Sequence, residues 1–210
     1  MVSRRWIGRG RLRIISGRWR SHRISSQGST TRPTTDRARQ ILFDIVGSRI
    51  QDARVLDLFA GSGALGLEAL SRGAVFALFV DQDPRATAGI RRTVSELAAE
   101  EFTQVWTRKV GPSLGALRNR GDVFDWIFAD PPYGTGDDLR VLNRLGAADR
   151  SLLRPGGRLV LEVPRRAPSP EDTGVLIPER ERELGGSALR FYRRSEDNPD
   201  TAQGEGPVES

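Results

Sequence analysis

The sequence predicts an α/β fold with seven strands in a mostly parallel sheet, an antiparallel edge and a small N-terminal β-hairpin. Short apolar runs alternate with segments of helical periodicity through most of the chain. The run at 55–58 leads into a glycine turn and then a helix, with glycines spaced as Gly61-x-Gly63-x-x-Gly66. The last two apolar runs, 175–177 and 188–193, follow each other without a helical segment between them, as expected of an antiparallel edge.

The elements follow one another in a regular order. Residues 12–15 and 19–24 predict the hairpin, and Asp36 offers an N-cap for the first helix. Pro84 is typical of a first helical turn, and Gly146 marks a break in the last helix. Strands are expected at 55–58, 76–80, 103–107, 123–129, 158–163, 175–177 and 188–193, and helices at 37–46, 64–70, 83–99, 113–118 and 137–153.

Length and composition indicate one catalytic domain with short appendages. We expect a basic arm and hairpin over 1–35, a catalytic domain over 36–194 and a disordered tail over 195–210, where apolar residues are nearly absent. No apolar run is long enough to span a bilayer, so we expect a soluble protein. We also expect it to be cytoplasmic and monomeric. The chain has no cysteine and a single histidine, His22, which argues against thiolate chemistry, a Ser-His-Asp centre and a metal site.

Positive charge is concentrated at the N-terminus. The net charge is +6, and residues 1–35 hold nine arginines and no acidic residue. Lysine occurs once, at Lys109, so a genome-wide preference for arginine could explain the choice of arginine but not the missing acids. Arginines interleaved with Trp6 and Trp19 favour a nucleic-acid contact over a merely solvated arm. The predicted RNA-binding residues are Arg13, Arg18, Arg20, Arg23 and Arg32.

The glycine turn predicts a nucleotide-like cofactor. Gly61 and Gly63 let the backbone approach a ligand at a helix N-terminus. Asp81 ends the next strand, at the distance where a carboxylate meets ribose hydroxyls. Asp57 precedes the turn and would repel a pyrophosphate but attract the ammonium of a methionine moiety, which favours S-adenosylmethionine over NAD. The predicted cofactor-binding residues are Asp57, Phe59, Ala60, Gly61, Gly63 and Asp81.

A second motif, Asp130-Pro131-Pro132-Tyr133, ends the predicted strand 123–129. The prolines stiffen this loop and so hold the Asp130 carboxylate, the Pro131 carbonyl and the Tyr133 ring in a fixed array. Two acceptors and an aromatic face suit the exocyclic amine of a flipped base, and Asp130 could take the released proton. Because ligands of open α/β sheets bind beyond the carboxyl ends of the strands, we expect this loop to meet the glycine turn across one crevice.

The aspartate also bears on which base is bound. A carboxylate offers two acceptors, which match the adjacent N1 and N2 donors of guanine; an amide would match adenine better. The preference for guanine is modest, because one carboxylate oxygen can also accept from the amine of adenine.

With both motifs present, the chain resembles the bacterial 16S rRNA guanine-N2 methyltransferases of the RsmD type. The resemblance covers about residues 11–193 and rests on the blocks 13–17, 31–39, 55–74 and 130–133. It implies a Rossmann-like methyltransferase fold whose N-terminal β-hairpin grips RNA, with S-adenosylmethionine as methyl donor. It also implies a guanine of 16S rRNA as target, in the small subunit or an assembly intermediate, as in 16S rRNA (guanine(966)-N(2))-methyltransferase.

One segment departs from that family and keeps other functions open. Family members carry an acidic residue after the third strand that contacts adenine, where this chain has Arg108-Lys109-Val110. A non-catalytic RNA-binding protein with a degenerate cofactor site is therefore an alternative. A DNA adenine-N6 methyltransferase is another, although the segment between Tyr133 and Pro155 leaves little room for target recognition. An NAD-linked oxidoreductase is the least favoured, because no acid or base for hydride transfer is evident.

Overall fold

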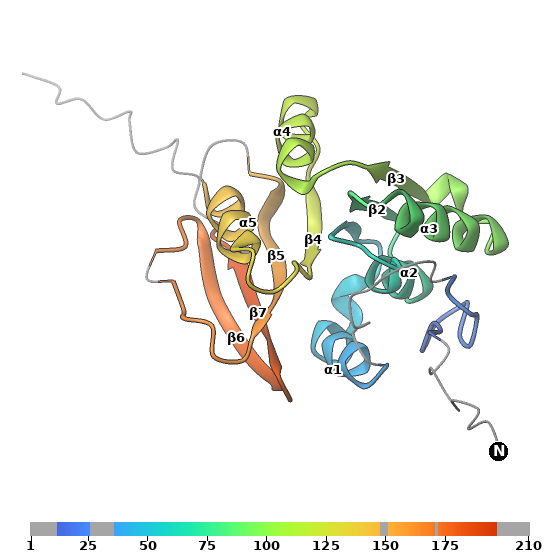
Figure 1. The fold of residues 1–210 in the computed structure, drawn as a ribbon, viewed down its shortest axis with the longest axis horizontal. Helices are drawn as coiled ribbons and strands as arrows, with labels where there is room; N and C mark the ends of the chain where they lie inside the picture. Colours follow the sequence, from blue (N-terminus) through green and yellow to red (C-terminus); the bar gives the residue numbers. More distant parts are fainter. Residues whose placement is uncertain (1–11, 26–35, 148–150, 171, 197–210) are drawn as a thin grey trace, which may run out of the picture. The chain divides into compact units, whose positions relative to one another are not determined.

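The computed structural model describes residues 12–25, 36–147, 151–170 and 172–196, and its Cα positions divide the chain into two compact units (Figure 1). The first unit runs to Val110 and the second begins at Gly111. Predictions that fall on residues 1–11, 26–35 and 197–210, including the role of Arg32 and the disordered tail, lie outside the described residues.

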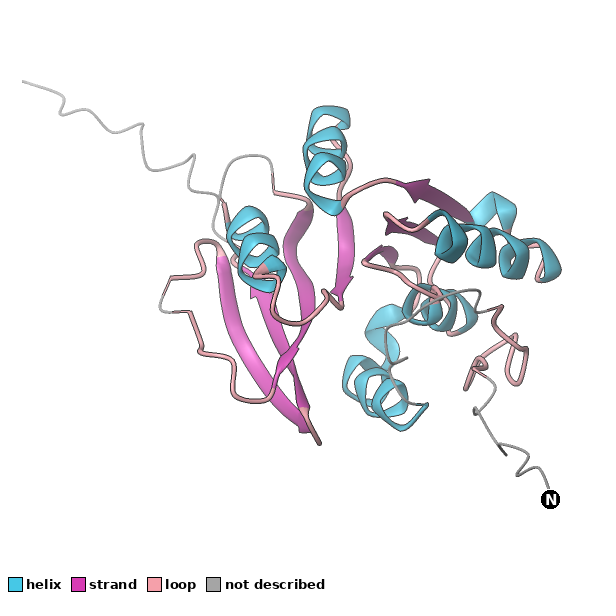
Figure 2. Ribbon diagram, viewed as in Figure 1, coloured by secondary structure: helices cyan, strands magenta, loops and turns pink. Residues whose placement is uncertain are grey.

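The first unit contributes three parallel strands, with helices packed on them (Figure 2). The strands lie in the order β3-β2-β1, so the second strand in the chain is central, and Asp57 of β1 pairs with Phe79 of β2. Both β1 and β2 are buried almost throughout, which explains their near-continuous apolar sequence. The elements are α1 (Asp36–Val46), η1 (Gly47–Ile50), β1 (Arg54–Leu58), α2 (Ala64–Ser71), β2 (Phe76–Asp81), α3 (Pro84–Glu96), η2 (Glu100–Phe102) and β3 (Thr103–Thr107).

The second unit holds the antiparallel edge. Its strands lie in the order β4-β5-β7-β6; β4 and β5 are parallel, and β7 is antiparallel to both of its neighbours. The core is apolar and includes Phe128 and Leu161. The elements are α4 (Val110–Arg120), β4 (Phe124–Ala129), α5 (Asp137–Gly146), β5 (Leu153–Pro164), β6 (Leu176–Leu184) and β7 (Ser187–Arg194).

The predicted fold class is confirmed, and most element positions agree to within a few residues. The break near Gly146 is confirmed too, because α5 ends there; a Cβ at Gly146 would lie 2.3 Å from the Thr173 carbonyl oxygen. The predicted helix over 137–153 extends too far, because β5 already begins at Leu153.

Strand β6 is three times as long as the sequence predicts. It continues through Pro178 into a run of charged residues, and nearly all of it is exposed. A strand that buries neither face has no apolar alternation to reveal it, and its charges protect a sheet edge from pairing with other chains. Glu179 anchors it by accepting from Arg158 of β5 at 3.0 Å.

The N-terminal segment 12–25 folds back on itself with less strand character than predicted. A single antiparallel bridge joins Arg13 to Arg23, and the Ile14 amide donates to the His22 carbonyl at 2.9 Å. Two full strands do not form here. The amides of Ser21 and Ile24 also donate across the segment, to the Ile14 and Leu12 carbonyls, both at 2.9 Å. The amides of Ile15, Ser16 and Trp19 instead bind side chains of the first unit, as described below.

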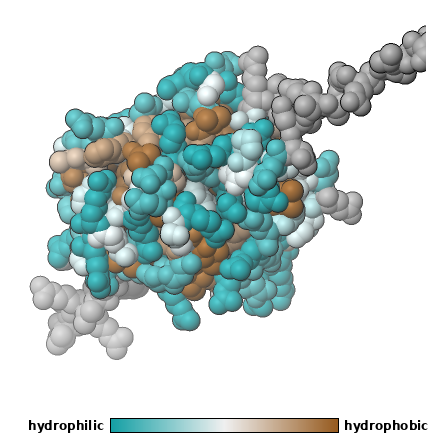
Figure 3. Space-filling model, turned by 180° about the vertical axis from the view of Figure 1, so that it is seen from behind, coloured by the Kyte–Doolittle hydropathy of each residue, from teal (hydrophilic) through white to brown (hydrophobic). Residues whose placement is uncertain are grey.

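The face shown in Figure 3 is mostly hydrophilic, with hydrophobic residues in small groups. Among the helices of the described residues, none has the length and apolar character needed to cross a bilayer.

Candidate functional site

The glycine turn of the first unit connects β1 to α2 with three residues at positive φ. Gly61 and Gly63 have φ of 52° and 74°, and Phe59 has φ of 55°. For a phenylalanine this conformation costs roughly 1–2 kcal/mol. Two hydrogen bonds hold the turn, from Ala60 N to the Val80 carbonyl at 3.1 Å and from Gly63 N to the Ala60 carbonyl at 2.7 Å. Strained backbone of this kind is concentrated at ligand-binding turns.

Asp81 closes the turn from the end of β2. Its Oδ2 accepts from Gly61 N at 2.7 Å, and its Oδ1 accepts from Asp83 N at 2.8 Å. Each carboxylate oxygen can accept more than one hydrogen bond, so Asp81 can hold the turn and still accept from ligand hydroxyls. The structure therefore brings the predicted residues Gly61 and Asp81 into direct contact.

Asp57 lies beneath the turn, 2% exposed. Its Oδ2 accepts from Gly66 N, in the first turn of α2, at 2.9 Å. A carboxylate is favourable at a helix N-terminus, so part of the Asp57 charge is used to hold α2. A Cβ at Gly66 would lie 2.4 Å from the Phe79 ring, so the third glycine of the motif is needed for the packing of α2 on β2.

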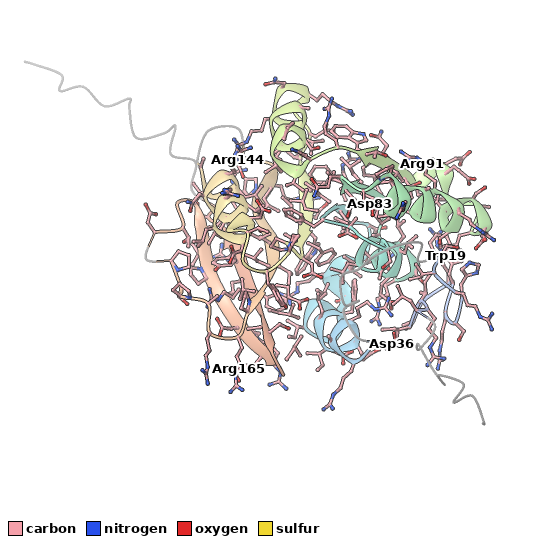
Figure 4. All side chains as sticks on the ribbon, viewed as in Figure 1. Trp19, Asp36, Asp83, Arg91, Arg144 and Arg165 are labelled. Atoms are coloured by element: carbon pink, nitrogen blue, oxygen red, sulfur yellow. The ribbon has the colours of Figure 1, made fainter. Side chains whose placement is uncertain are left out.

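Cationic side chains follow the end of β3, next to Asp81. The Arg108 amide donates to the Asp81 carbonyl at 2.9 Å, and the exposed Arg91 of α3 donates to the Val105 carbonyl at 2.9 Å. Lys109 is exposed beside them. Figure 4 labels Arg91 on α3 and Asp83 at the start of that helix. The acidic residue expected here from the family resemblance is absent from this position.

The second unit carries the Asp130–Tyr133 loop at the end of β4. Pro131 is buried and Asp130 partly buried, whereas Pro132 and Tyr133 are exposed. The Thr135 hydroxyl donates to the Pro132 carbonyl at 2.9 Å, which ties the loop to the start of α5. A hydrogen bond therefore restrains the loop in addition to its two prolines.

Tyr133 is held at its hydroxyl while its ring stays accessible. The hydroxyl donates to Glu162 Oε1 of β5 at 3.0 Å, and the residue is 54% exposed. Burial of the hydroxyl end, and next the negative charge of Glu162, raise the pKa of Tyr133 to about 12. The phenol thus stays protonated through the physiological range and presents a tethered aromatic ring.

The predicted RNA-binding arginines of segment 12–25 all reach the surface. Arg13, Arg18, Arg20 and Arg23 are exposed, while Ile14 and Ile24, which follow Arg13 and Arg23, are buried. Trp19 is less available than the sequence suggests, because the Arg18 guanidinium lies 3.9 Å from the centre of its ring. The segment therefore offers cations rather than a bare aromatic face.

Three residues with clear roles in these sites were not found from the sequence. Glu68 and Ser71 of α2 bind the backbone of segment 12–25, and Glu162 binds Tyr133. Glu68 had a detectable signal, since a lone carboxylate inside an apolar helix requires a buried donor. Glu162 had none, because its partner lies 29 residues away. No cluster of three or more potential metal ligands occurs among the described residues.

Comparison with known proteins extends over nearly the whole chain. Residues 12–193 match the sequence family described as conserved hypothetical protein 95. Ribosomal RNA small subunit methyltransferase D of Escherichia coli K12 is 34% identical over 205 residues, covering 94% of each chain. The protein of the same name from Haemophilus influenzae is 30% identical over 191 residues, covering 88% of this chain and 95% of its own.

Solved structures agree with the fold. The structure of yhhF from Escherichia coli has a TM-score of 0.78 at 32% identity and covers 90% of this chain and 100% of its own. An RNA methyltransferase from Salinibacter ruber, solved in complex with S-adenosyl-L-homocysteine, shares the fold at a TM-score of 0.57 and 15% identity, covering 80% of this chain and 97% of its own.

Proposed function

Because the chain belongs to the conserved hypothetical protein 95 family, we propose that it is an S-adenosylmethionine-dependent methyltransferase acting on the exocyclic N2 amine of a guanine in 16S rRNA. The observation that carries this proposal is its near full-length similarity to ribosomal RNA small subunit methyltransferase D. The substrate is the small ribosomal subunit or an assembly intermediate of it, and the protein acts as a cytoplasmic monomer. By analogy with the 16S rRNA guanine-N2 methyltransferases that the chain resembles, the target is the guanine at position 966.

The residues of the first unit fit this cofactor. Gly61 leaves the inner side of the turn open, since a Cβ built there would meet only the Phe59 carbonyl oxygen, at 3.9 Å. Asp81 accepts from ribose hydroxyls while it holds the turn, and Asp57 supplies negative charge for the methionine ammonium. Phe59, Ala60 and Gly63 complete the binding turn. S-adenosylmethionine supplies an electrophilic methyl group.

Asp130 to Tyr133 bind and activate the target base. The Tyr133 ring stacks on guanine, and the Asp130 carboxylate and Pro131 carbonyl accept the two hydrogens of the amine. Pro132 fixes the backbone between them. When bound, S-adenosylmethionine would supply the methyl group to the amine nitrogen, and Asp130 takes the proton that the nitrogen loses.

The exposed arginines of segment 12–25, with Arg32, bind RNA phosphates. Arginine pairs with phosphate regardless of sequence, so these residues position the RNA while the Asp130 loop selects the base. With the Trp19 ring covered by Arg18, phosphate contact is favoured over base stacking on this segment.

Calorimetric titration followed by a methylation assay tests the proposal. The protein should bind S-adenosylmethionine and not NADH, and should then label small subunits from a strain that lacks the modification. Digestion of the RNA and mass spectrometry should reveal N2-methylguanosine. Binding of NADH alone, or N6-methyldeoxyadenosine in a DNA substrate as the only product, would contradict the proposal.

The Asp130→Ala variant tests the assigned chemistry. Removal of the proton acceptor should lower kcat at least 100-fold, since general bases contribute about 10²–10⁴-fold, while affinity for S-adenosylmethionine stays within about twofold. Single-turnover methylation and calorimetry on the same preparation measure both quantities. An Asp130→Ala enzyme with undiminished turnover would show that the proton leaves by another route.

A second function is supported by one observation. Arg91, Arg108 and the exposed Lys109 surround the end of β3, where an acidic adenine contact would be expected. A non-catalytic RNA-binding protein would keep the arginine segment and lose the cofactor site. Absence of S-adenosylmethionine binding, with RNA binding retained, would favour it.

A further inference from the structure

Residues 15–19 are fastened to the C-terminal half of α2 by two side chains. The Glu68 carboxylate accepts from the amides of Ile15 at 2.7 Å and Ser16 at 3.0 Å. The Ser71 hydroxyl accepts from the Trp19 amide at 3.0 Å and donates to the Ser16 carbonyl at 2.6 Å. The Ser71 carbonyl also accepts from the Arg18 amide at 2.8 Å. Five hydrogen bonds thus hold a five-residue turn on one turn of helix.

The anchor is buried and closely fitted. Glu68 is 0% exposed, and its charge is balanced by Arg72 Nε at 2.7 Å. A buried carboxylate is stable only when donors surround it, and here two of its three donors come from the segment. Gly17 has φ of 85°, and a Cβ on it would lie 1.8 Å from the Ser71 carbonyl oxygen, so the segment rests directly on the helix backbone.

A second set of contacts ties residues 22–25 of the segment to α3. The Ser25 amide donates to the Thr93 hydroxyl at 3.0 Å, and His22 Nε2 lies 3.5 Å from a Glu96 oxygen. Both the turn and the C-terminal end of the segment are therefore attached to helices of the first unit. Figure 1 shows the segment beside α2, and Figure 4 labels Trp19 there.

The other end of α2 belongs to the glycine turn. Gly63 is its N-cap, and Gly66 N is held by Asp57. Eight residues of helix span about 12 Å at 1.5 Å per residue, and α2 is buried on nearly every side. A short buried helix is rigid, so α2 sets the separation between the glycine turn and the exposed arginines Arg18 and Arg20.

We propose that Glu68 and Ser71 are positioning residues that hold the arginines of segment 12–25 in a preformed array for an RNA backbone, at a separation from the glycine turn set by α2. This inference rests on the proposed function for the identity of the RNA. It adds that the array exists before RNA binds, so the free energy of RNA binding includes no cost for ordering the segment.

The test compares Glu68→Ala and Ser71→Ala with two matched controls, Glu101→Ala and Ser95→Ala, whose side chains are exposed on the same unit. Affinity for an RNA stem-loop of mixed sequence is measured by fluorescence anisotropy over a series of KCl concentrations. The anchor variants should bind about tenfold more weakly at every salt concentration, because ordering the freed segment costs binding energy. Their slope of log affinity against log salt should stay the same, because every arginine is still present.

The Arg18→Ala/Arg20→Ala variant, in contrast to the anchor variants, should change the slope of log affinity against log salt. Loss of two phosphate contacts should reduce the salt slope by roughly 1.8, if each contact contributes about 0.9 as on duplex DNA. Calorimetry with S-adenosylmethionine distinguishes a positional effect from a folding defect, because an anchor variant that is merely destabilised would lose affinity for that ligand as well. Ser71→Ala keeps Glu68 paired and serves if Glu68→Ala does not fold.

Amide hydrogen exchange tests the preformed state directly. In the RNA-free wild-type protein, the amides of Ile15, Ser16, Arg18 and Trp19 should be protected, and Glu68→Ala should release the first two. Exchange of these amides at the rate of an unfolded peptide in the wild-type protein would overturn the inference, as would unchanged RNA affinity in both anchor variants. If the wild-type protein binds and methylates RNA while the anchor variants lose nothing, only the inference fails; if it binds no RNA at all, the proposed function fails with it.

Discussion

At the scale of single residues, Tyr133 and Glu162 show how an exposed aromatic ring can be held still. The hydrogen bond between the Tyr133 hydroxyl and Glu162 is 3.0 Å long and restrains the ring at the end opposite the backbone. A restrained ring loses less entropy when a base stacks on it. Removal of the hydroxyl or of its acceptor should therefore weaken substrate binding without changing the rate of the chemical step.

Tyr133→Phe and Glu162→Ala should each lower kcat/KM for RNA about fivefold, the equivalent of one ordinary hydrogen bond. Glu162→Gln keeps an acceptor and should stay within twofold of wild type. The double variant Tyr133→Phe/Glu162→Ala should be no worse than either single variant. Additive losses would mean that the two residues act separately, and Glu183→Gln, an exposed glutamate of β6, serves as control.

The pKa of Tyr133 predicts a pH dependence with a definite sign. Because the folded protein raises this pKa to about 12 from an ordinary value of 10, the neutral phenol is favoured by folding. Its contribution to stability is fully present below about pH 10 and is lost as the pH rises toward 12. The chain has two tyrosines, so ¹³C NMR of labelled tyrosine Cζ should resolve both, with Tyr133→Phe giving the assignment. Glu162→Gln should shift the Tyr133 titration to lower pH, and an unmoved titration would contradict the contact.

Asp81 is the residue on which the glycine turn depends. Asp81→Ala removes the acceptor of the Gly61 amide as well as the proposed ribose contact, so affinity for S-adenosylmethionine should fall at least 30-fold, on the order of 2 kcal/mol for a charged hydrogen-bond acceptor. Calorimetry measures this loss. Undiminished affinity would remove Asp81 from the binding site.

At the scale of elements, α3 begins with a complete set of start signals. Asp83 accepts from the Arg85 amide at 2.8 Å, and Pro84 occupies the first turn. Asp83→Ala should lower the free energy of unfolding by about 1 kcal/mol, the usual cost of a lost N-cap. Urea denaturation measures this cost, and Asp83→Asn, which keeps the acceptor, should recover most of it. An Asp83→Asn protein as unstable as Asp83→Ala would mean that the charge and not the cap matters.

Sequence patterns do not reveal the full length of strand β6, but they do reveal where helix α2 begins. The exposed edge strand has no apolar alternation and was predicted too short. Helix α2 is buried almost all round, so its amphipathic pattern is weak, but the glycine turn before it reveals its start. Boundaries are therefore most predictable where a turn or cap is chemically specific.

At the scale of the whole molecule, cofactor binding should appear as added thermal stability. A ligand that binds only the folded state stabilises it by about 2.7 kcal/mol at 100 times its Kd. The melting temperature should therefore rise with S-adenosylmethionine and stay constant with NADH. A Lys109→Asp variant, which restores an acidic residue after β3, should show a larger rise at the same ligand concentration. An equal rise in both proteins would mean that Lys109 has no effect on binding.

Sequence patterns alone predict the fold class, the order of most elements, the glycine turn with Asp57 and Asp81, and the stiff Asp130–Tyr133 loop. These features depend on local chemistry: apolar periodicity, glycine at positive φ, proline and the charge of a residue next to a turn. The contact between Asp81 and Gly61 could be anticipated, because parallel strands place both at the carboxyl edge of one sheet.

The side chains that support these features can be identified only in the folded protein. The sequence signalled arginines near the N-terminus, but their attachment depends on Glu68 and Ser71, more than fifty residues away. The tether of Tyr133 likewise depends on a glutamate of another strand. Such pairs leave no local pattern, because a carboxylate or hydroxyl is chemically the same whether it faces water or a distant backbone amide, and only folding selects its partner.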